Sequence, residues 1–265
     1  MHDLSVSFIQ SDIHWQDHGA NLAMFEEKIW QITQSVDLII LPEMFNTGFS
    51  MNVEHSAEPV NGRSFKWLRQ MSAQTGSVVT GSLIIKEGGR FYNRLVWMNP
   101  DGTYSHYDKR HLFRMAEEDR YFSHGNNRII MNLKGWKICP LICYDLRFPV
   151  WSRNRINDDH ELEYDLLLYL ANWPASRTEV WTTLLKARAI ENLCYVIGVS
   201  RIGIDGNNTD YNGHSNLIDF KGRERLSWGN VEESKILTLN YQELINFRHK
   251  FPAHYDSDSF KIDNI

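Results

Sequence analysis

The sequence predicts an α/β domain in which a mixed sheet, or two sheets, is covered on the outside by helices. Short apolar runs alternate with amphipathic stretches at helical spacing in both halves of the chain. Between them, residues 77–108 carry the turn sequences Gly88-Gly89 and Pro100-Asp101-Gly102, which are typical of antiparallel strands. No repeat or linker interrupts the 265 residues, so we expect one domain over 1–265, with 247–265 as a C-terminal tail.

Composition excludes several classes of protein. A hydrophobic content of 42% and a charged content of 23% are those of an ordinary globular chain. The formal charge of −5 gives no basic field, so nucleic acid is not an expected partner. Three cysteines are too few for a disulfide framework, and neither a signal peptide nor an apolar run of 18 residues is visible. We therefore expect a cytoplasmic protein without a membrane partner.

The first elements form a β-α-β unit followed by a second helix. Residues 4–10 alternate apolar and polar side chains, which indicates a strand. Apolar residues at helical spacing predict a helix over 19–35, and the short apolar run 37–41 predicts a buried strand that ends at Glu43. Another helix is expected over 62–75.

The middle of the chain combines a meander, a loop and a buried strand. The three strands expected within 77–108 end at Lys109, and residues 110–125, rich in charge and aromatics, suit a loop over a site. The stretch WKICPLICYDLRFP (136–149) then opens with an apolar run typical of a strand buried on both faces. Cys143 follows immediately past the end of that strand.

The second half of the chain continues the alternation of expected strands and helices. Residues 153–164 are polar and acidic, which predicts an exposed connection. The following apolar segments predict two buried strands with a helix between them, and the last segments predict a closing hairpin. The expected ranges are a strand over 164–174 ending at Asn172-Trp173, a helix over 178–192, a strand over 194–200, and a hairpin of 214–228 with 234–241.

Three chemically useful side chains stand just past expected strand ends, namely Glu43, Lys109 and Cys143. Alone, Cys143 fits a buried structural cysteine better than a nucleophile, and Glu43 with Lys109 fits an ordinary ion pair. If the strands are neighbours, Glu43 can take the thiol proton as the sulfur attacks. Lys109 and the backbone N–H of Tyr144 can then stabilise an oxyanion.

The same residues lie in motifs that resemble a known superfamily. LPEMFNTGF (41–49), YDKRHLF (107–113) and ICYDLRFP (142–149) resemble the three signature blocks of the nitrilase, or carbon–nitrogen hydrolase, superfamily, in the same order. Further similarity is found in ANWP (171–174), KARAIEN (186–192) and GHSNLIDFKG (213–222). The resemblance covers residues 4 to 240.

The resemblance implies a fold and a reaction. The fold is an α-β-β-α sandwich of two mixed sheets with helices outside, which stacks into four layers across a homodimer. A Glu43–Lys109–Cys143 triad would cleave a non-peptide carbon–nitrogen bond through a thioester. A second glutamate in the loop after the lysine would orient that lysine and help to shuttle protons. Glu118, seven residues before Gly125, matches it best, and Glu117 is the alternative.

Within the superfamily the chain resembles ω-amidases, which hydrolyse the terminal amide of α-keto acids such as 2-oxoglutaramate and 2-oxosuccinamate. Such substrates need a carboxylate anchor, for which a guanidinium is well suited. Arg147 matches a carboxylate-binding position of related enzymes, although a salt bridge to Asp145 or another core carboxylate explains it equally well. Arg177 is a second anchor, and Asn172 and Trp173 are expected to wall the pocket beside Tyr144.

Other functions are compatible with parts of this pattern. A nitrilase or a hydrolase of N-carbamoyl and other small amides would use the same triad. An inactive nitrilase-like binding or scaffold protein would be expected to lack a triad residue, and all three are present. No metal or organic cofactor is expected, because phosphate-binding glycine motifs are missing and Asp158-Asp159-His160-Glu161 fits a solvated loop.

Overall fold

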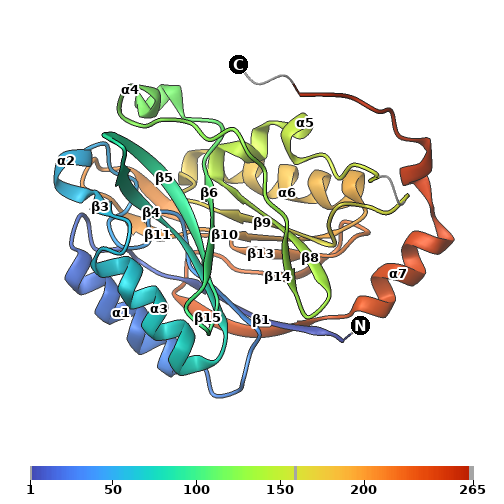
Figure 1. Cartoon of the computed structure of the whole chain (residues 1–265), viewed down its shortest axis with the longest axis horizontal. Coiled ribbons are helices and arrows are strands. Elements are labelled where there is room, and N and C mark those ends of the chain that lie inside the picture. Colours follow the sequence, from blue (N-terminus) through green and yellow to red (C-terminus); the bar gives the residue numbers. More distant parts are fainter. Residues whose placement is uncertain (1, 158–159, 263–265) are drawn as a thin grey trace.

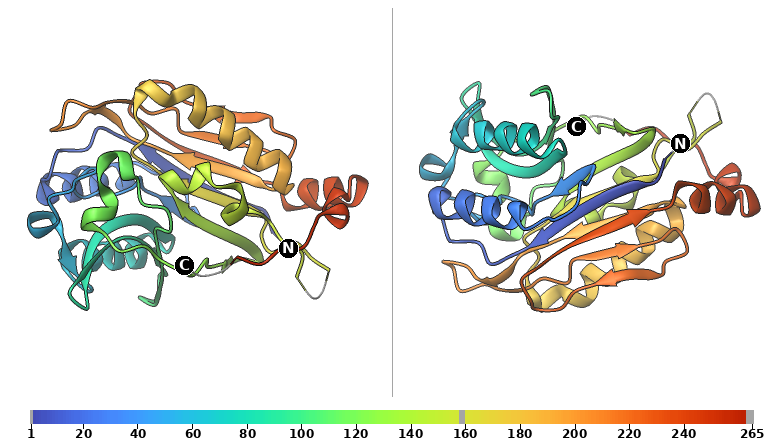
Figure 2. Two further views of the ribbon diagram at one scale, coloured as in Figure 1. Left: turned by 90° about the horizontal axis from the view of Figure 1, so that it is seen from above. Right: turned by 90° about the horizontal axis from the view of Figure 1, so that it is seen from below.

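Two sheets packed face to face form the centre of the molecule, with helices on both outer surfaces (Figure 1). The computed structural model describes residues 2–157 and 160–262. The layers follow the order helix, sheet, sheet, helix in the two further views (Figure 2). This is the α-β-β-α sandwich that the sequence resemblance implied. Among the described residues, no helix is both long and apolar enough to cross a membrane.

The first sheet combines parallel strands with the predicted meander. β1, β2 and β4 are parallel, β4, β5 and β6 are successive antiparallel neighbours, and β15 closes the other edge antiparallel to β1. Its strands in spatial order are β15 (Glu233–Leu239), β1 (Leu4–Gln10), β2 (Leu38–Ile40), β4 (Val78–Glu87), β5 (Arg90–Met98) and β6 (Tyr104–Asp108), with β3 (Glu58–Pro59) beside β4.

The second sheet is built around three parallel strands, β8, β9 and β10. Their apolar runs are buried because the first sheet covers one face and α6 covers the other. Its strands in spatial order are β14 (Glu224–Ser227), β13 (Asn216–Ile218), β10 (Tyr195–Val199), β9 (Leu166–Leu170), β8 (Trp136–Ile142) and β7 (Met131–Leu133). A separate short pair, β11 (Ile202–Ile204) and β12 (Asp210–Asn212), was not predicted.

Three longer helices cover the sheets. α1 (His18–Trp30) begins at Asp17, whose side chain accepts a hydrogen bond from the N–H of Ala20 at 3.0 Å. α3 (Arg63–Thr75) packs on β4, and α6 (Thr178–Asn192) packs on β10, where a Cβ at Gly198 would lie 2.6 Å from Trp181. The described part of the chain also holds the shorter helices α2 (Val53–Ser56), α4 (Glu118–Tyr121), α5 (Pro149–Ser152) and α7 (Tyr241–Lys250), and the 3₁₀ helices Arg114–Ala116, Cys143–Arg147, Ala175–Arg177 and Ala253–Asp256.

Two expectations about strands and helices were wrong. The first helix ends at Trp30 rather than at residue 35, because the chain turns there to bring Val36 into the core ahead of β2. The closing hairpin does not form between 214–228 and 234–241. Instead β13 pairs with β14, while β15 crosses to β1 in the other sheet, and Gln10 holds the crossing by donating to the carbonyl of Gly229 at 2.8 Å.

The connection 153–164 and the start of the C-terminal tail also differ from expectation. The connection 153–164 is partly buried, because the Asn154 side chain donates to the carbonyl of Tyr164 and accepts from its N–H. Its residues Asp158 and Asp159 lie outside the described residues. The expected start of the tail at residue 247 falls within α7, whose Phe247 ring lies 4.9 Å from the ring of Phe220.

Candidate active site

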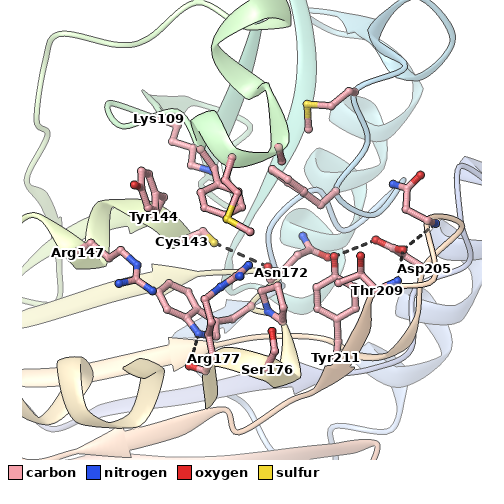
Figure 3. A pocket seen from close by; sticks show the side chains of 18 residues that line it. Lys109, Cys143, Tyr144, Arg147, Asn172, Ser176, Arg177, Asp205, Thr209 and Tyr211 are labelled. Carbon is pink, nitrogen blue, oxygen red and sulfur yellow. Dashed lines mark hydrogen bonds between the residues drawn. The ribbon is translucent and has the colours of Figure 1, made fainter. Parts of the chain in front are cut away.

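A cavity of about 430 Å³ opens where strands of both sheets end (Figure 3). Cys143 follows β8, Asn172 lies two residues past β9, and Lys109 follows β6. Glu43 lies three residues past β2 and contacts Lys109 behind the cavity wall. The three predicted chemical groups therefore meet at one edge of the sandwich, as expected for sites at the carboxyl ends of strands.

Two carboxylates hold the ammonium of Lys109. Its Nζ lies 2.9 Å from Oε1 of Glu43, and 3.1 and 3.0 Å from the two carboxylate oxygens of Glu118. All three side chains are fully buried. Glu117, the alternative to Glu118, is exposed and pairs with Arg120 instead. The structure thus brings Glu118, and not Glu117, to the lysine.

The protonation of this cluster follows from burial and from charge. Burial lowers the pKa of Lys109, but the opposing charges of Glu118 and Glu43 outweigh it and raise that pKa above its ordinary value. Burial raises the pKa of Glu118, against the lowering effect of Lys109. Burial, reinforced by the nearby charge of Glu43, also raises the pKa of the Cys143 thiol well above its usual range. The resting site therefore holds an ammonium and a neutral thiol.

Cys143 occupies a strained turn at the start of the 3₁₀ helix Cys143–Arg147. Its φ of 44° lies in the left-handed region, which non-glycine residues seldom adopt outside constrained sites. Its Sγ lies 3.9 Å from the backbone carbonyl oxygen of Asn172. The turn directs the sulfur into the cavity, although only 9% of the residue surface is exposed.

Further contacts fix the orientation of Glu43. Its Oε2 accepts from the N–H of Asn172 at 2.8 Å, and the Asn172 side chain donates to the carbonyl of Glu43 at 2.6 Å. Asn93, on β5, donates to Oε1 of Glu43 at 2.8 Å and to Oε1 of Glu118 at 3.3 Å. Sequence reasoning missed Asn93, because a single polar residue in a strand carries no motif. The one sequence feature that could have identified it is a polar amide side chain within an apolar strand.

Two guanidinium groups line the cavity beside the thiol. Arg147 lies over the ring of Trp173, 5.5 Å from its centre, and Arg177 lies over the ring of Phe113 at 5.3 Å. The expected alternative for Arg147, a salt bridge to Asp145, is not among the ion pairs of the described residues. Asp145 is occupied by other donors. Tyr144, Asn172 and Trp173 also line the cavity.

The cavity is also lined by residues that were not among the expected site residues. Phe49 and Met51 add apolar surface, and Asp205, Thr209 and Tyr211 add polar groups. The carboxylate of Asp205 is already used, because it accepts from Tyr211 Oη at 2.9 Å and from the N–H of Thr209 at 3.0 Å. These residues reach the cavity through the unpredicted β11–β12 pair.

The arrangement can perform acyl transfer to a thiol and then to water. It combines a nucleophile at a strained turn, a carboxylate within a buried charge cluster, and an ammonium near the sulfur. A sequence profile described as "carbon–nitrogen hydrolase" matches residues 5–238, which is most of the chain. The chain belongs to the carbon–nitrogen hydrolase family. The predicted resemblance is therefore confirmed, and this hydrolase is an amide-cleaving enzyme.

Known proteins are similar to this hydrolase over almost its full length. An omega-amidase YafV of Yersinia enterocolitica is 42% identical over 263 residues, covering 99% of this chain and all of the relative. A 2-oxoglutaramate amidase of Bacillus subtilis is 31% identical, covering 95% and 96%. A superfamily member of Xanthomonas campestris, crystallised with an arsenic adduct in its active site, matches with a TM-score of 0.97, 41% identity, and coverage of 99% and 100%.

Proposed function

We propose that this hydrolase is an ω-amidase that converts small α-keto acid amides, such as 2-oxoglutaramate or 2-oxosuccinamate, to the dicarboxylate and ammonia. The observation that carries the proposal is the presence in one cavity of the Cys143 thiol and two guanidinium groups, Arg147 and Arg177, with Lys109 beside them. The thiol and the ammonium suit amide cleavage, and the guanidiniums suit a substrate that carries a carboxylate. The relatives that bear the names omega-amidase and 2-oxoglutaramate amidase support this substrate class.

The first half-reaction forms a thioester. Cys143 Sγ attacks the amide carbon while Glu43 takes the thiol proton, so the poorly ionised sulfur reacts without a free thiolate. Lys109 Nζ and the N–H of Tyr144 donate to the oxyanion. The carbon–nitrogen bond then breaks, the proton held by Glu43 passes to the nitrogen, and ammonia leaves.

The second half-reaction releases the acid. Water attacks the thioester carbon as Glu43 takes one of its protons, the carbon–sulfur bond breaks, and that proton returns to the sulfur. Glu118 touches neither reacting bond in this scheme. It holds Lys109 through two contacts of 3.0–3.1 Å, so its role is to position the ammonium.

The charges around the cavity favour a keto acid over an amino acid. Arg147 and Arg177 attract the substrate carboxylate, whereas an α-ammonium would meet two like charges. Asp205, the acidic side chain in the cavity lining, already accepts from Tyr211 and from backbone N–H groups. An ammonium would therefore gain little from it. The keto oxygen, by contrast, is a neutral acceptor for a guanidinium donor.

Ammonia release from a panel of compounds tests the proposal. We expect 2-oxoglutaramate and 2-oxosuccinamate to give kcat/KM values at least about 100-fold above those of glutamine, nitriles and N-carbamoyl amino acids, which corresponds to about 2.7 kcal/mol. Intact-mass measurement after quenching should show an acyl adduct that disappears in Cys143→Ala. Faster turnover of a nitrile or a carbamoyl compound would point to the alternative reactions on the same triad. Ammonia release by Cys143→Ala at the parent rate would contradict the mechanism.

We also propose that the hydrolase forms a homodimer and is located in the cytoplasm. The sequence resemblance supports the dimer, and three unpaired cysteines suit a reducing compartment. Light scattering after gel filtration would report twice the mass of one chain if the dimer forms, and the mass of one chain if it does not.

A further inference from the structure

A buried carboxylate outside the cavity ties together the two segments that carry Lys109 and Cys143. Asp145 is fully buried, and neither it nor its partners Tyr107 and His111 line the cavity. Its Oδ1 accepts from the backbone N–H of His111 at 3.0 Å and from His111 Nδ1 at 2.7 Å. Its Oδ2 accepts from Tyr107 Oη at 2.8 Å and from the N–H of Ile142 at 3.1 Å.

These contacts bracket both reacting groups along the chain. Tyr107 and His111 stand two residues before and two residues after Lys109. Ile142 directly precedes Cys143, and Asp145 follows it by two residues. One carboxylate therefore fixes the backbone on both sides of the ammonium and on both sides of the sulfur.

Other contacts hold the same assembly from outside. The indole of Trp151 donates to Tyr107 Oη at 3.0 Å, and the His111 ring stacks on Phe148 with centroids 3.7 Å apart and planes 6° apart. The side chain of His111 remains 22% exposed, in contrast to that of Asp145. A carboxylate oxygen accepts hydrogen bonds, so His111 Nδ1 is assigned as the donor in this contact.

We propose that Asp145 and His111 are positioning residues that set the distance between the Lys109 ammonium and the Cys143 sulfur. Because attack on a carbonyl depends steeply on the placement of the reacting groups, a displacement of about 1 Å can lower the rate about 100-fold. The proposal rests on the proposed function, because it assumes that Cys143 and Lys109 do the chemistry. It assigns no bond-making step to Asp145 or His111.

The test compares four variants with the parent. His111→Ala removes one donor from a partly exposed site and leaves the other contacts of Asp145, so folding should survive. His111→Asn places an amide nitrogen where Nδ1 stood. Asp145→Asn replaces the carboxylate by an amide, whose NH₂ group would face some of the four donors that the carboxylate now accepts from. Asp165→Asn is the matched control. Asp165 is also a buried carboxylate, and it accepts from the backbone N–H of Lys137 and from the side chain of Arg248. It precedes β9, at the end of that strand away from the cavity.

We expect His111→Ala to lower kcat about tenfold or more while KM for 2-oxoglutaramate changes less than about threefold, because the cavity arginines are untouched. His111→Asn should recover much of the loss. The double variant His111→Ala/Asp145→Asn should be no slower than Asp145→Asn alone, because both changes break the same contact. Folded Asp165→Asn should keep kcat within about threefold of the parent.

Two results would overturn the proposal. One is a folded His111→Ala variant whose kcat lies within about twofold of the parent. The other is a loss of kcat in folded Asp165→Asn as large as that in His111→Ala, which would make the effect a general consequence of disturbing the core. Cys143→Ala separates the two proposals. If it stays active, the proposed function fails, whereas if it is inactive and His111→Ala is normal, only the positioning role fails.

Discussion

The Nζ of Lys109 and the Oε1 of Glu43 lie 2.9 Å apart, although 66 positions separate the two residues in the chain. Neither side chain is exposed to solvent, and Glu118 adds a second negative charge to the same ammonium. Removing such charges from water costs several kcal/mol per ion, so a buried cluster of this kind contributes little net stability. We infer that the cluster persists because the chemistry of the cavity requires it.

Replacement of Lys109 by methionine tests this interpretation. Lys109→Met leaves Glu43 and Glu118 buried without their cation, so we expect a loss of about 3–5 kcal/mol in the free energy of unfolding and no measurable ammonia release. Lys86→Met is the matched control, because Lys86 forms an exposed pair with Glu54 at 3.5 Å and should change stability by less than about 1 kcal/mol. Urea unfolding measures both, and equal midpoints for the two variants would contradict the expectation.

The two cavity arginines should control binding of charged substrates. Arg147→Ala should raise KM for 2-oxoglutaramate about 10- to 100-fold, the effect of losing a charge-assisted hydrogen bond worth about 1.5–3 kcal/mol, and Arg177→Ala should raise it less. Steady-state kinetics should show no such change with a neutral amide. Arg69→Ala removes an arginine that stacks on Phe65 outside the cavity, and should leave KM unaltered. An equal rise in KM for charged and neutral amides would exclude the arginines as carboxylate anchors.

The loop after Lys109 depends on a small residue at position 125. The N–H of Gly125 donates to the carbonyl of Lys109 at 3.0 Å, and a Cβ at Gly125 would lie 2.2 Å from the carbonyl oxygen of Asp108. Gly125→Ala should therefore displace the end of β6, destabilise the fold by about 1–3 kcal/mol and lower kcat. Gly229→Ala, where a Cβ meets nothing within 4 Å, should leave kcat unchanged. Thermal unfolding and steady-state kinetics of the two variants test this expectation. A kcat of Gly125→Ala equal to that of the parent would contradict it, because the end of β6 would then accommodate the Cβ without moving Lys109.

Stability should fall in alkaline solution because of the buried cysteines. Burial raises the pKa of Cys139 to about 12, and it also raises the pKa of Cys143 and of Cys194. The folded state therefore keeps thiol protons that the unfolded chain loses above about pH 8.5. This contribution is fully present below that pH and is lost as the pH rises, by about 1.4 kcal/mol per pH unit for each cysteine.

Unfolding in urea between pH 8.5 and 10 checks this expectation. Cys139→Ala should have a shallower dependence of stability on pH than the parent, by about 1.4 kcal/mol per pH unit. Its lower absolute stability does not affect the slope. Parallel curves for the two proteins would show that Cys139 titrates alike in the folded and unfolded states.

Elements with strong apolar patterning were predictable from the sequence. The strand over 4–10, the helix over 178–192 and the meander within 77–108 match β1, α6 and β4–β6. The partner of 234–241 was not predictable, because an alternating edge strand fits either sheet and only packing selects one. The pair β11–β12 was not predictable either, because its strands are short and carry little apolar patterning.

The sequence by itself determined the family, the order of the chemical groups along the chain and the strand ends that carry them, because motif residues and hydrophobic periodicity are local properties. Only the tertiary structure decided that Glu118 rather than Glu117 contacts Lys109, and that Asn93 joins them. It also decided that Asp145 binds His111 rather than Arg147. Such choices depend on distances between segments far apart in the chain, and those distances are set by how the two sheets pack.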